Sequence, residues 1–141
     1  MLKSAIYLLF LIILPGIFQS IVAADPPEAR NNFPFAVLSA DSIDMGQLLP
    51  GGQAQGMLSI TNAGRYDLVI SRVRSSCGLL ITTWPAQPLK PGEQGTISYR
   101  YDTSRTGSFK RNIVIHTNAW HKTLTIPVKG EVLPANTKPS D

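Results

Sequence analysis

The six residues from Thr96 to Tyr101, with the sequence TISYRY, alternate strictly between polar and apolar side chains. In an extended chain the isoleucine and both tyrosines share one face, and the threonine, serine and arginine share the other. A period of two residues is typical of a half-buried β-strand and not of a helix. The stretch therefore predicts a strand with one face in a hydrophobic core and the other face in water.

The same alternation recurs on both sides of this stretch. Apolar residues stand at every second position in three further segments: Leu58 and Ile60; Ile113 and Ile115; and Leu124, Ile126 and Val128. Turn-forming residues separate the segments, namely Pro50-Gly51-Gly52, Asn62-Ala63-Gly64, Lys90-Pro91-Gly92-Glu93, Thr106-Gly107-Ser108 and Asn118-Ala119. No helical apolar stripe occurs after residue 24. About seven short strands at this spacing predict an all-β fold, an immunoglobulin-like antiparallel β-sandwich.

Two positions break the regular pattern. Val73 falls on the face opposite to that of the apolar residues just before it, so a β-bulge near Ser71 or Arg72 is needed to return its side chain to the core. Pro127 stands inside the last alternating segment and has no N–H to donate to a neighbouring strand. We therefore expect its nitrogen to lie at a sheet edge or at a bulge.

Residues 1–24 have the features of a secretory signal peptide. Lys3 supplies a positive charge, a long apolar run follows, and Val22-Ala23-Ala24 is a small-residue cleavage site. We expect cleavage after this site, export to the periplasm or the cell exterior, and no membrane span in what remains. The alternative is an uncleaved N-terminal membrane anchor, because residues 5–24 are about long enough to span a bilayer.

The rest of the chain predicts one folded domain with a short polar segment at each end. Residues 25–32 and 135–141 contain prolines and polar residues with little apolar surface, so we expect a flexible leader and a flexible tail. The β-sandwich should occupy residues 33–134. Of the 13 basic residues only Lys3 lies before residue 25, which leaves 12 basic against 9 acidic side chains. This small excess of basic residues is spread along the chain among acidic ones, which excludes the clustered positive charge of a nucleic-acid-binding surface.

A set of short motifs between Leu38 and Val132 carries a family resemblance. The motifs are Ile43-Asp44-Met45-Gly46 before Pro50-Gly51, Ile60-Thr61-Asn62-Ala63-Gly64, Leu68-Val69-Ile70-Ser71, Ser76-Cys77-Gly78, Trp84-Pro85, Leu89-Lys90-Pro91-Gly92-Glu93, Gly107-Ser108-Phe109-Lys110, His116-Thr117-Asn118 and Lys129-Gly130-Glu131-Val132. In this order they resemble the bacterial domain-of-unknown-function family numbered 1573, which is related to Hydin-like and major-sperm-protein-like domains. The resemblance implies an exported, seven-stranded β-sandwich of the bacterial envelope and no established activity.

Cys77 is the only cysteine, so it cannot form a disulfide within the chain. The resembling family commonly has Cys-Gly-Cys-Thr where this chain has Cys77-Gly78-Leu79-Leu80, and one thiol cannot do the redox or metal chemistry of a pair. Because free cysteine is among the most buried residue types, we expect Cys77 to be buried or half-buried and inert. Reactivity or pairing with another molecule remains the alternative.

Cys77, His116 and His121 are the candidate ligands of a copper or zinc site, since thiolate and imidazole suit these ions. His116 alternates with buried isoleucines and should face water, and His121 lies in a turn, so the sequence gives no reason for the three to meet. A catalytic thiol would also need an activating helix N-terminus or cation, and no helix is predicted. We therefore expect no metal, no cofactor and no enzymatic activity.

Five residues are candidates for contacts with a partner. Trp120 stands at a turn, where its ring should be exposed, whereas Trp84 precedes a rigid Pro turn and should pack over the end of the sandwich. Arg72, Arg74 and Arg100, with other basic residues, either form a positive face toward an anionic lipid or glycan or simply keep a sheet face solvated.

The function expected from these features is that of an exported, non-enzymatic module that binds another envelope or secreted protein or serves as a structural adaptor. One alternative is a thiol or metal-binding protein that uses Cys77 with His116 and His121. A second alternative is glycan binding through Trp120. Because every open sandwich has sheet edges, pairing with a strand of a partner is a further possibility for the contact.

Overall fold

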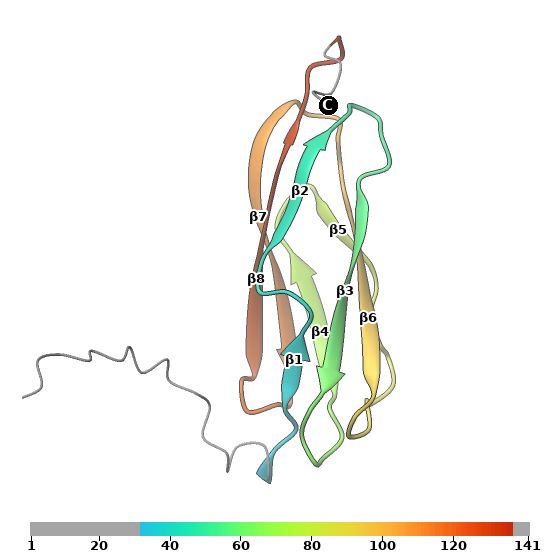
Figure 1. The fold of residues 1–141 in the computed structure, drawn as a ribbon, viewed down its shortest axis with the longest axis vertical. Coiled ribbons are helices and arrows are strands. Elements are labelled where there is room, and N and C mark those ends of the chain that lie inside the picture. The colour runs from blue at the N-terminus through green and yellow to red at the C-terminus, as the bar shows by residue number, and fades with distance from the viewer. Residues whose placement is uncertain (1–31, 137–141) are drawn as a thin grey trace, which may run out of the picture.

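The computed structural model describes residues 32–136, which form eight strands in two four-stranded sheets. The strands are β1 (Ala36–Leu38), β2 (Ile43–Leu48), β3 (Gln55–Asn62), β4 (Ile70–Ser75), β5 (Leu79–Thr83), β6 (Gln94–Tyr101), β7 (Gly107–Thr117) and β8 (Thr123–Val132). One sheet has the order β1-β3-β6-β5 and the other β2-β8-β7-β4, with all strands along the long axis of the domain (Figure 1). The predicted signal peptide and most of the predicted leader and tail lie outside the described residues.

The hydrophobic core lies between the two sheets. Its fully buried side chains come from the inner faces of both: Leu58, Ile60, Leu68, Ile97, Ile113, Ile115, Ile126, Val128 and Val132. In β6 the predicted alternation is present, because Tyr99 and Tyr101 are buried and Arg100 is exposed. Burial of each aliphatic side chain of this size stabilises the fold by about 1.5–3 kcal/mol. The prediction of an immunoglobulin-like β-sandwich is confirmed, with eight strands where about seven were expected.

One strand pair is parallel, which the antiparallel prediction missed. β1 pairs with β3, and after it the chain crosses to the other sheet, where β2 runs parallel to β8. The Ser39 N–H donates to the Ser59 carbonyl at the crossing point (2.9 Å). The direction of β2 depends on where the chain changes sheet, and side-chain alternation carries no information about that point.

The four edge strands each carry a feature that disfavours pairing with a further strand. β1 has only three residues, and the pairing register shifts by an irregularity in the ladders of β2, β4 and β5. The interior ladders β3–β6 and β7–β8 have no such shift. Short and bulged edge strands are the usual protection against edge-to-edge association. The sheet edges of the described domain are therefore poor sites for strand addition.

The irregularity in β4 confirms the predicted bulge. It lies between Ile70 and Arg72, so that Ser71 is the extra residue, and it returns Val73 to the core. The Ser71 hydroxyl donates to the carbonyl of His116 on β7 (3.2 Å). The bulge thus places two exposed residues of β4 opposite a single residue of β7.

Pro127 does not lie in an edge strand, because β8 is flanked by β2 and β7. The Thr117 N–H donates to the Lys122 carbonyl, so these two residues form a hydrogen-bonded pair. Along an antiparallel ladder, hydrogen-bonded pairs alternate with non-hydrogen-bonded pairs. Pro127 therefore falls at a non-hydrogen-bonded pair with Asn112, so its nitrogen faces away from β7. The pairing with β2 begins one residue later, at Val128. The absence of an N–H at Pro127 thus removes no bond of the β7–β8 ladder.

Candidate interaction surfaces

One end of the sandwich is built by chain segments that hydrogen-bond to one another. Three of them meet there: residues 33–35 before β1, the loop 63–69 between β3 and β4, and the turn 118–122 between β7 and β8. The Trp120 N–H donates to the Pro34 carbonyl (3.1 Å), and the Ala63 N–H donates to the Phe35 carbonyl (2.7 Å). These bonds hold the side chains of this end in fixed positions relative to the sheets.

Asn118 joins the β7–β8 turn to the β3–β4 loop. Its side-chain oxygen accepts from the Val69 N–H (2.8 Å), and its side-chain nitrogen donates to the Asp67 carbonyl (3.1 Å). Its own backbone N–H donates to the Val69 carbonyl (3.1 Å). Three bonds from one residue keep the two connections side by side.

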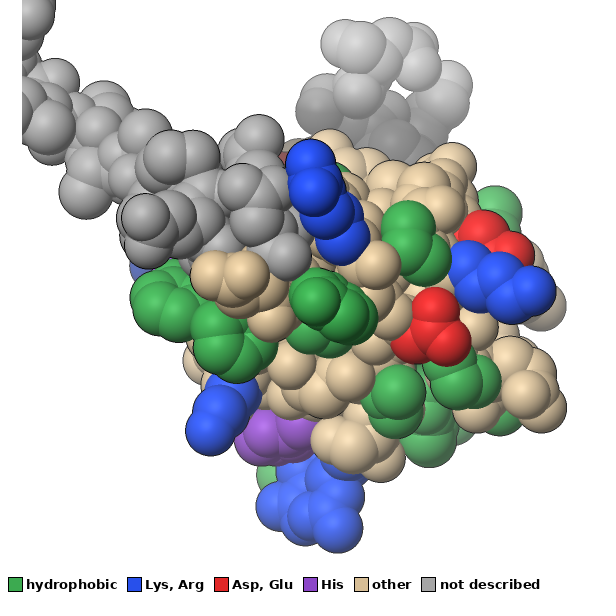
Figure 2. Space-filling model, turned by 90° about the horizontal axis from the view of Figure 1, so that it is seen from below, with side chains coloured by type: hydrophobic (Ala, Val, Ile, Leu, Met, Phe, Trp, Pro, Cys, Tyr) green, Lys and Arg blue, Asp and Glu red, His purple; other side chains and the backbone are tan. Residues whose placement is uncertain are grey.

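Exposed apolar side chains gather on this end, which we call the aromatic end and define as Phe33, Tyr66, Val69 and Trp120. Trp120 and Phe33 are each 44% exposed, and their ring centroids lie 5.3 Å apart with planes tilted by 53°. Figure 2 views this end and shows hydrophobic side chains beside basic ones. Trp120 is therefore exposed at its turn as predicted, with a second aromatic ring against it.

A buried amide supports the aromatic end from inside. The Asn62 side chain is fully buried; its nitrogen donates to the carbonyls of Tyr66 (2.7 Å) and Leu89 (2.8 Å), and its oxygen accepts from the Gly64 N–H (3.0 Å). The side chain thereby connects the β3–β4 loop to the β5–β6 connection. Buried polar groups with all their hydrogen bonds made favour one loop arrangement over others.

Trp84 is partly exposed and stands beside a proline that packs on the sheet. Its side chain is 40% exposed, and it is the neighbouring Pro85 that packs inward, against Gly95 of β6. A Cβ at Gly95 would collide with the Pro85 ring. The rigid turn therefore seats the proline on the sheet and leaves the tryptophan outside.

The three candidate arginines do not form one surface. Arg72 and Arg74 lie on β4 and Arg100 lies on β6, so they belong to different sheets. Arg72 is paired with His116 and Arg74 with Val114 across the β4–β7 ladder. Of the three, only Arg72 and Arg74 share a surface, which is the outer side of β4 and β7.

Cys77 is exposed, so the expectation of a buried thiol is wrong. It stands in the tight connection between β4 and β5, where Gly78 has a φ of 83° and the Arg111 Nε donates to the Cys77 carbonyl (2.6 Å). Connections between strands usually run over the surface of a domain, and here that tendency outweighs the tendency of free cysteine to be buried.

The structure keeps Cys77 apart from both histidines. Ser76, its neighbour, pairs with Asn112 of β7, and His116 lies four residues further along that strand, which is about 13 Å. His121 lies beyond the end of β7, where its ring contacts Phe35 edge-on (6.4 Å). Within residues 32–136 no three His, Cys, Asp or Glu side chains are grouped as metal ligands would be.

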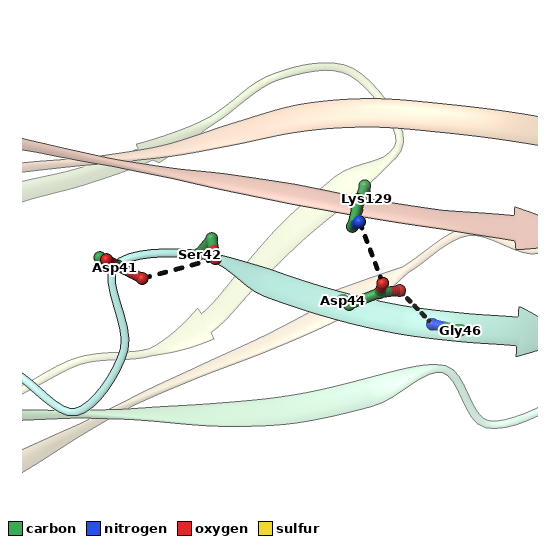
Figure 3. A network of polar contacts seen from close by, with 5 residues as sticks. All are labelled: Asp41, Ser42, Asp44, Gly46 and Lys129. Carbon is green, nitrogen blue, oxygen red and sulfur yellow. Dashed lines mark hydrogen bonds and ion pairs between the residues drawn. The ribbon is translucent and has the colours of Figure 1, made fainter.

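A hollow of about 620 Å³ lies on the outer side of β2, β8 and β7. On its rim the Asp44 carboxylate accepts from the Gly46 N–H (2.9 Å) and pairs with the Lys129 ammonium (3.2 Å) (Figure 3). The Gly46 N–H, and after it Lys129, lower the pKa of Asp44 below its ordinary value of 3.8. Both charged side chains are exposed, so this pair is screened by water and contributes little to stability.

Sequence reasoning missed three of the four residues of the aromatic end. Phe33 precedes Pro34, and Tyr66 and Val69 lie in a connection whose turn chemistry was recognised but whose side chains were not considered. It also missed Asn62, although Leu58 and Ile60 of the same strand place position 62 on the inner face. Extending the alternation by one step would have identified a buried asparagine.

No helix among residues 32–136 is long and apolar enough to cross a membrane. This finding concerns the described part of the chain alone.

The fold is shared with several solved structures. A protein of unknown function from Porphyromonas gingivalis W83 is 23% identical, with a TM-score of 0.63 over 76% of this chain and 50% of that one. The PapD-like domain 7 of human CEP192, an ASH/PapD-like domain, is 14% identical, with a TM-score of 0.61 over 80% of this chain and 92% of that domain. SSP-19, an MSP-domain-like protein of Caenorhabditis elegans, is 14% identical, with a TM-score of 0.50 over 67% of this chain and 98% of that one.

At these identities the likeness establishes the fold alone. This chain spans half the length of the Porphyromonas protein. No curated protein matches the sequence.

The family is given by the sequence itself. Residues 37–132, well over half of the chain, match the family model described as protein of unknown function, DUF1573. The matched range contains every strand from β2 to β8, together with all the motifs on which the resemblance was based. This chain therefore belongs to the DUF1573 family, and its domain is an immunoglobulin-like β-sandwich of the kind found in PapD-like and major-sperm-protein-like domains.

Proposed function

We propose that this domain is a non-enzymatic protein-interaction module of the bacterial envelope and that it contacts its partner through the aromatic end. The observation that carries the proposal is the Trp120–Phe33 pair, two rings in contact that are each 44% exposed. Tryptophan and other aromatic residues dominate the binding energy of protein interfaces, because each buries a large apolar area on association.

The rigidity of this end supports the proposal. Trp120 is bonded through its backbone to Pro34, and Asn118 fixes the turn that carries it. Binding residues are commonly found on loops that a rigid scaffold positions. A surface that is already ordered loses little conformational entropy on binding, so more of its contact energy is available for affinity.

The other function classes find less support among the described residues. A thiol or metal function would need Cys77 near a histidine, and about 13 Å of strand separates its position from that of His116. Strand addition is disfavoured by the bulges in β2, β4 and β5. The aromatic end offers a means of contact that needs neither a reactive thiol nor a free strand edge.

Site-directed photo-crosslinking in the bacterium that makes the protein tests the proposal. A photoreactive phenylalanine replaces Tyr66 in the full-length chain, and matched control positions are Glu131 on β8 and Ser98 on β6, which face outward from the two sheets. We expect one protein to be captured from position 66 and not from the controls. Capture of the same protein from all three positions, or from none, would refute the aromatic end as the contact surface.

Purified binding partners then allow affinity to be measured. We expect Trp120→Ala combined with Phe33→Ala to weaken binding by at least about tenfold, which corresponds to about 1.4 kcal/mol. Trp84→Ala removes an equally exposed tryptophan outside the aromatic end and should change the affinity by less than about twofold.

Glycan binding through Trp120 is the alternative to a protein partner, and tryptophan fluorescence distinguishes the two. Trp120 is the only tryptophan left in a Trp84→Phe variant, because the chain has 2 tryptophans. Quenching of its fluorescence by cell-wall sugars, without capture of a protein from position 66, would replace the protein partner with a carbohydrate.

A further inference from the structure

The outer face of β4 and β7 carries cationic side chains away from any carboxylate of its own sheet. Val73, Ile113 and Ile115 point into the core, so the residues between them point outward. The outward residues of this region are Arg72 and Arg74 on β4, Asn112, Val114 and His116 on β7, and Thr123 and Thr125 on β8. We call this region the arginine face.

The carboxylates of the same sheet lie toward its other end. Asp44 is in the row of Lys110 and Lys129, six residues along β7 from His116, which is about 20 Å. Glu131 pairs with Ser108, two residues further on. The arginine face is therefore separate from the mixed charge around Asp44, and the nearby Asp67, in the loop before β4, lies outside the sheet and forms no ion pair with either arginine.

The bulge in β4 shapes this surface. Because Ser71 and Arg72 stand opposite the single residue His116, a hollow of about 300 Å³ opens between these three side chains. The Thr123 hydroxyl lies 3.4 Å from the His116 Nδ1 at the next strand. The Arg72 guanidinium and the His116 imidazole thus line one concave spot, where their N–H groups can donate hydrogen bonds to an anionic oxygen.

Neither arginine has an ion-pair partner within residues 32–136. A guanidinium presents its donors as a planar fork that matches a carboxylate in a bidentate pair. Arg72 and Arg74 are two residues apart in one strand, so their positions are separated by about 7 Å. This is also the distance between alternate residues of any other extended chain.

We propose that the arginine face binds an extended segment of another protein in which acidic residues occupy alternate positions. The segment runs along β4 over the outer face of the sheet, because the bulge disfavours its addition at the β4 edge. One carboxylate pairs with Arg72 over the hollow beside His116, and the next pairs with Arg74. This surface is distinct from the aromatic end, so the inference stands whether or not the proposed function does.

Other anionic partners fit this face less well. A membrane surface would be held better by apolar side chains that insert among the lipids, and the apolar Val114 of this face is half-buried. The exposed large hydrophobic residues of the described domain lie elsewhere: Phe33, Val37, Leu49, Met57, Tyr66, Val69, Leu80, Trp84 and Trp120. A polysaccharide would be expected to stack on the ring of a tryptophan, tyrosine or phenylalanine, and the arginine face has none of these residues.

Fluorescence anisotropy with a labelled peptide that alternates Glu and Thr tests the proposal on the purified protein at low ionic strength. We expect Arg72→Gln combined with Arg74→Gln to weaken binding by at least about tenfold. The matched control is Arg100→Gln combined with Arg105→Gln, which removes the same charge from exposed positions outside the arginine face and should weaken binding by less than about twofold. Thermal melting shows whether each variant is folded.

A third variant separates charge from geometry and covers a failure of the first to fold. Arg72→Lys combined with Arg74→Lys keeps both charges but loses the planar forks, and we expect affinity between that of the wild type and the Gln variant. Equal loss in the Gln variant and its control, or equal binding of a Gln–Thr peptide, would overturn the proposal. So would tighter binding to phosphatidylglycerol vesicles or to an acidic polysaccharide that depends on the same two arginines.

Discussion

The side chain of Asn62 donates a hydrogen bond to the carbonyl oxygen of Leu89, which lies 27 residues later in the chain, at 2.8 Å. The same side chain also bonds the Tyr66 carbonyl and the Gly64 N–H. One buried amide thus determines how two connections pack against each other next to the aromatic end. The surface proposed to bind a partner therefore depends on a residue that no partner can touch.

Replacing Asn62 with alanine should destabilise the domain strongly. The buried Gly64 N–H loses its acceptor, the Tyr66 carbonyl loses a half-buried donor, and the Leu89 carbonyl keeps only the Leu68 N–H. A buried group left without a partner costs about 1–3 kcal/mol. We expect a loss of at least about 2 kcal/mol in the free energy of unfolding, or a fall of more than about 8 °C in Tm. Thermal melting followed by circular dichroism measures it.

Asn118→Ala is the matched control. Asn118 also makes side-chain bonds to two backbone groups, but it is exposed, so water replaces the lost bonds and the cost should stay below about 1 kcal/mol. A Tm loss for Asn118→Ala as large as that for Asn62→Ala would show that burial is not the cause.

Asp44 should titrate below its ordinary pKa of 3.8 in the native protein, because the Gly46 N–H and the Lys129 ammonium both favour the carboxylate. A native pKa below that of the unfolded chain stabilises the fold above pH 3.8, and this contribution is lost as the pH falls through the native pKa. An NMR titration of the Asp44 carboxyl carbon measures the value directly.

Lys129→Met tests which contact matters more to the Asp44 pKa. The Gly46 N–H is the larger cause, so the pKa should rise in this variant but remain below 3.8. Lys110→Met removes a neighbouring ammonium that makes no ion pair with Asp44, and it should move the pKa less. A full return to 3.8 in Lys129→Met would assign the shift to the ion pair alone.

The alternation of side chains predicted the fold class and even the irregularity in β4. Val73 could reach the core only if one residue was inserted before it, and the bulge at Ser71 does this. Such predictions succeed because the period of a strand and the position of its core face are local properties. The family resemblance succeeded for a related reason, since its motifs mark turns and strand ends.

What the sequence could not predict depends on contacts between distant residues. The parallel pairing of β2 with β8 follows from the point at which the chain crosses between sheets. The Trp120–Phe33 contact joins residues at opposite ends of the domain sequence, and the exposure of Trp84 follows from the fit of Pro85 on Gly95. The alternation of side chains within one strand carries no information about these long-range contacts.

Cys77 should react with a thiol reagent in the native protein, because its side chain is exposed. We expect one equivalent to react with Ellman's reagent at a rate within about tenfold of that in denaturant. We also expect a covalent dimer to form on oxidation and to disappear on reduction. A thiol that reacts only after unfolding would contradict the exposed position, and Cys77→Ser gives the background of the assay.

Gly64→Ala should disturb the aromatic end from beneath. A Cβ at this position would lie 2.5 Å from the Phe35 nitrogen and 2.7 Å from the Phe33 oxygen, and backbone atoms cannot rotate away as a side chain can. Residues 33–35 must therefore shift, which weakens the Ala63–Phe35 hydrogen bond and removes Phe33 from Trp120. We expect a loss of about 1–3 kcal/mol in the free energy of unfolding.

The fluorescence of Trp120 reports this shift in a Trp84→Phe background. As Phe33 leaves, the Trp120 ring becomes more exposed to water, so its emission should move to longer wavelength. Ala63→Ser changes an exposed residue of the same loop and should leave both the spectrum and the Tm unchanged. Because the shift would also separate the two rings proposed to bind a partner, Gly64→Ala should weaken partner binding although Gly64 itself is buried.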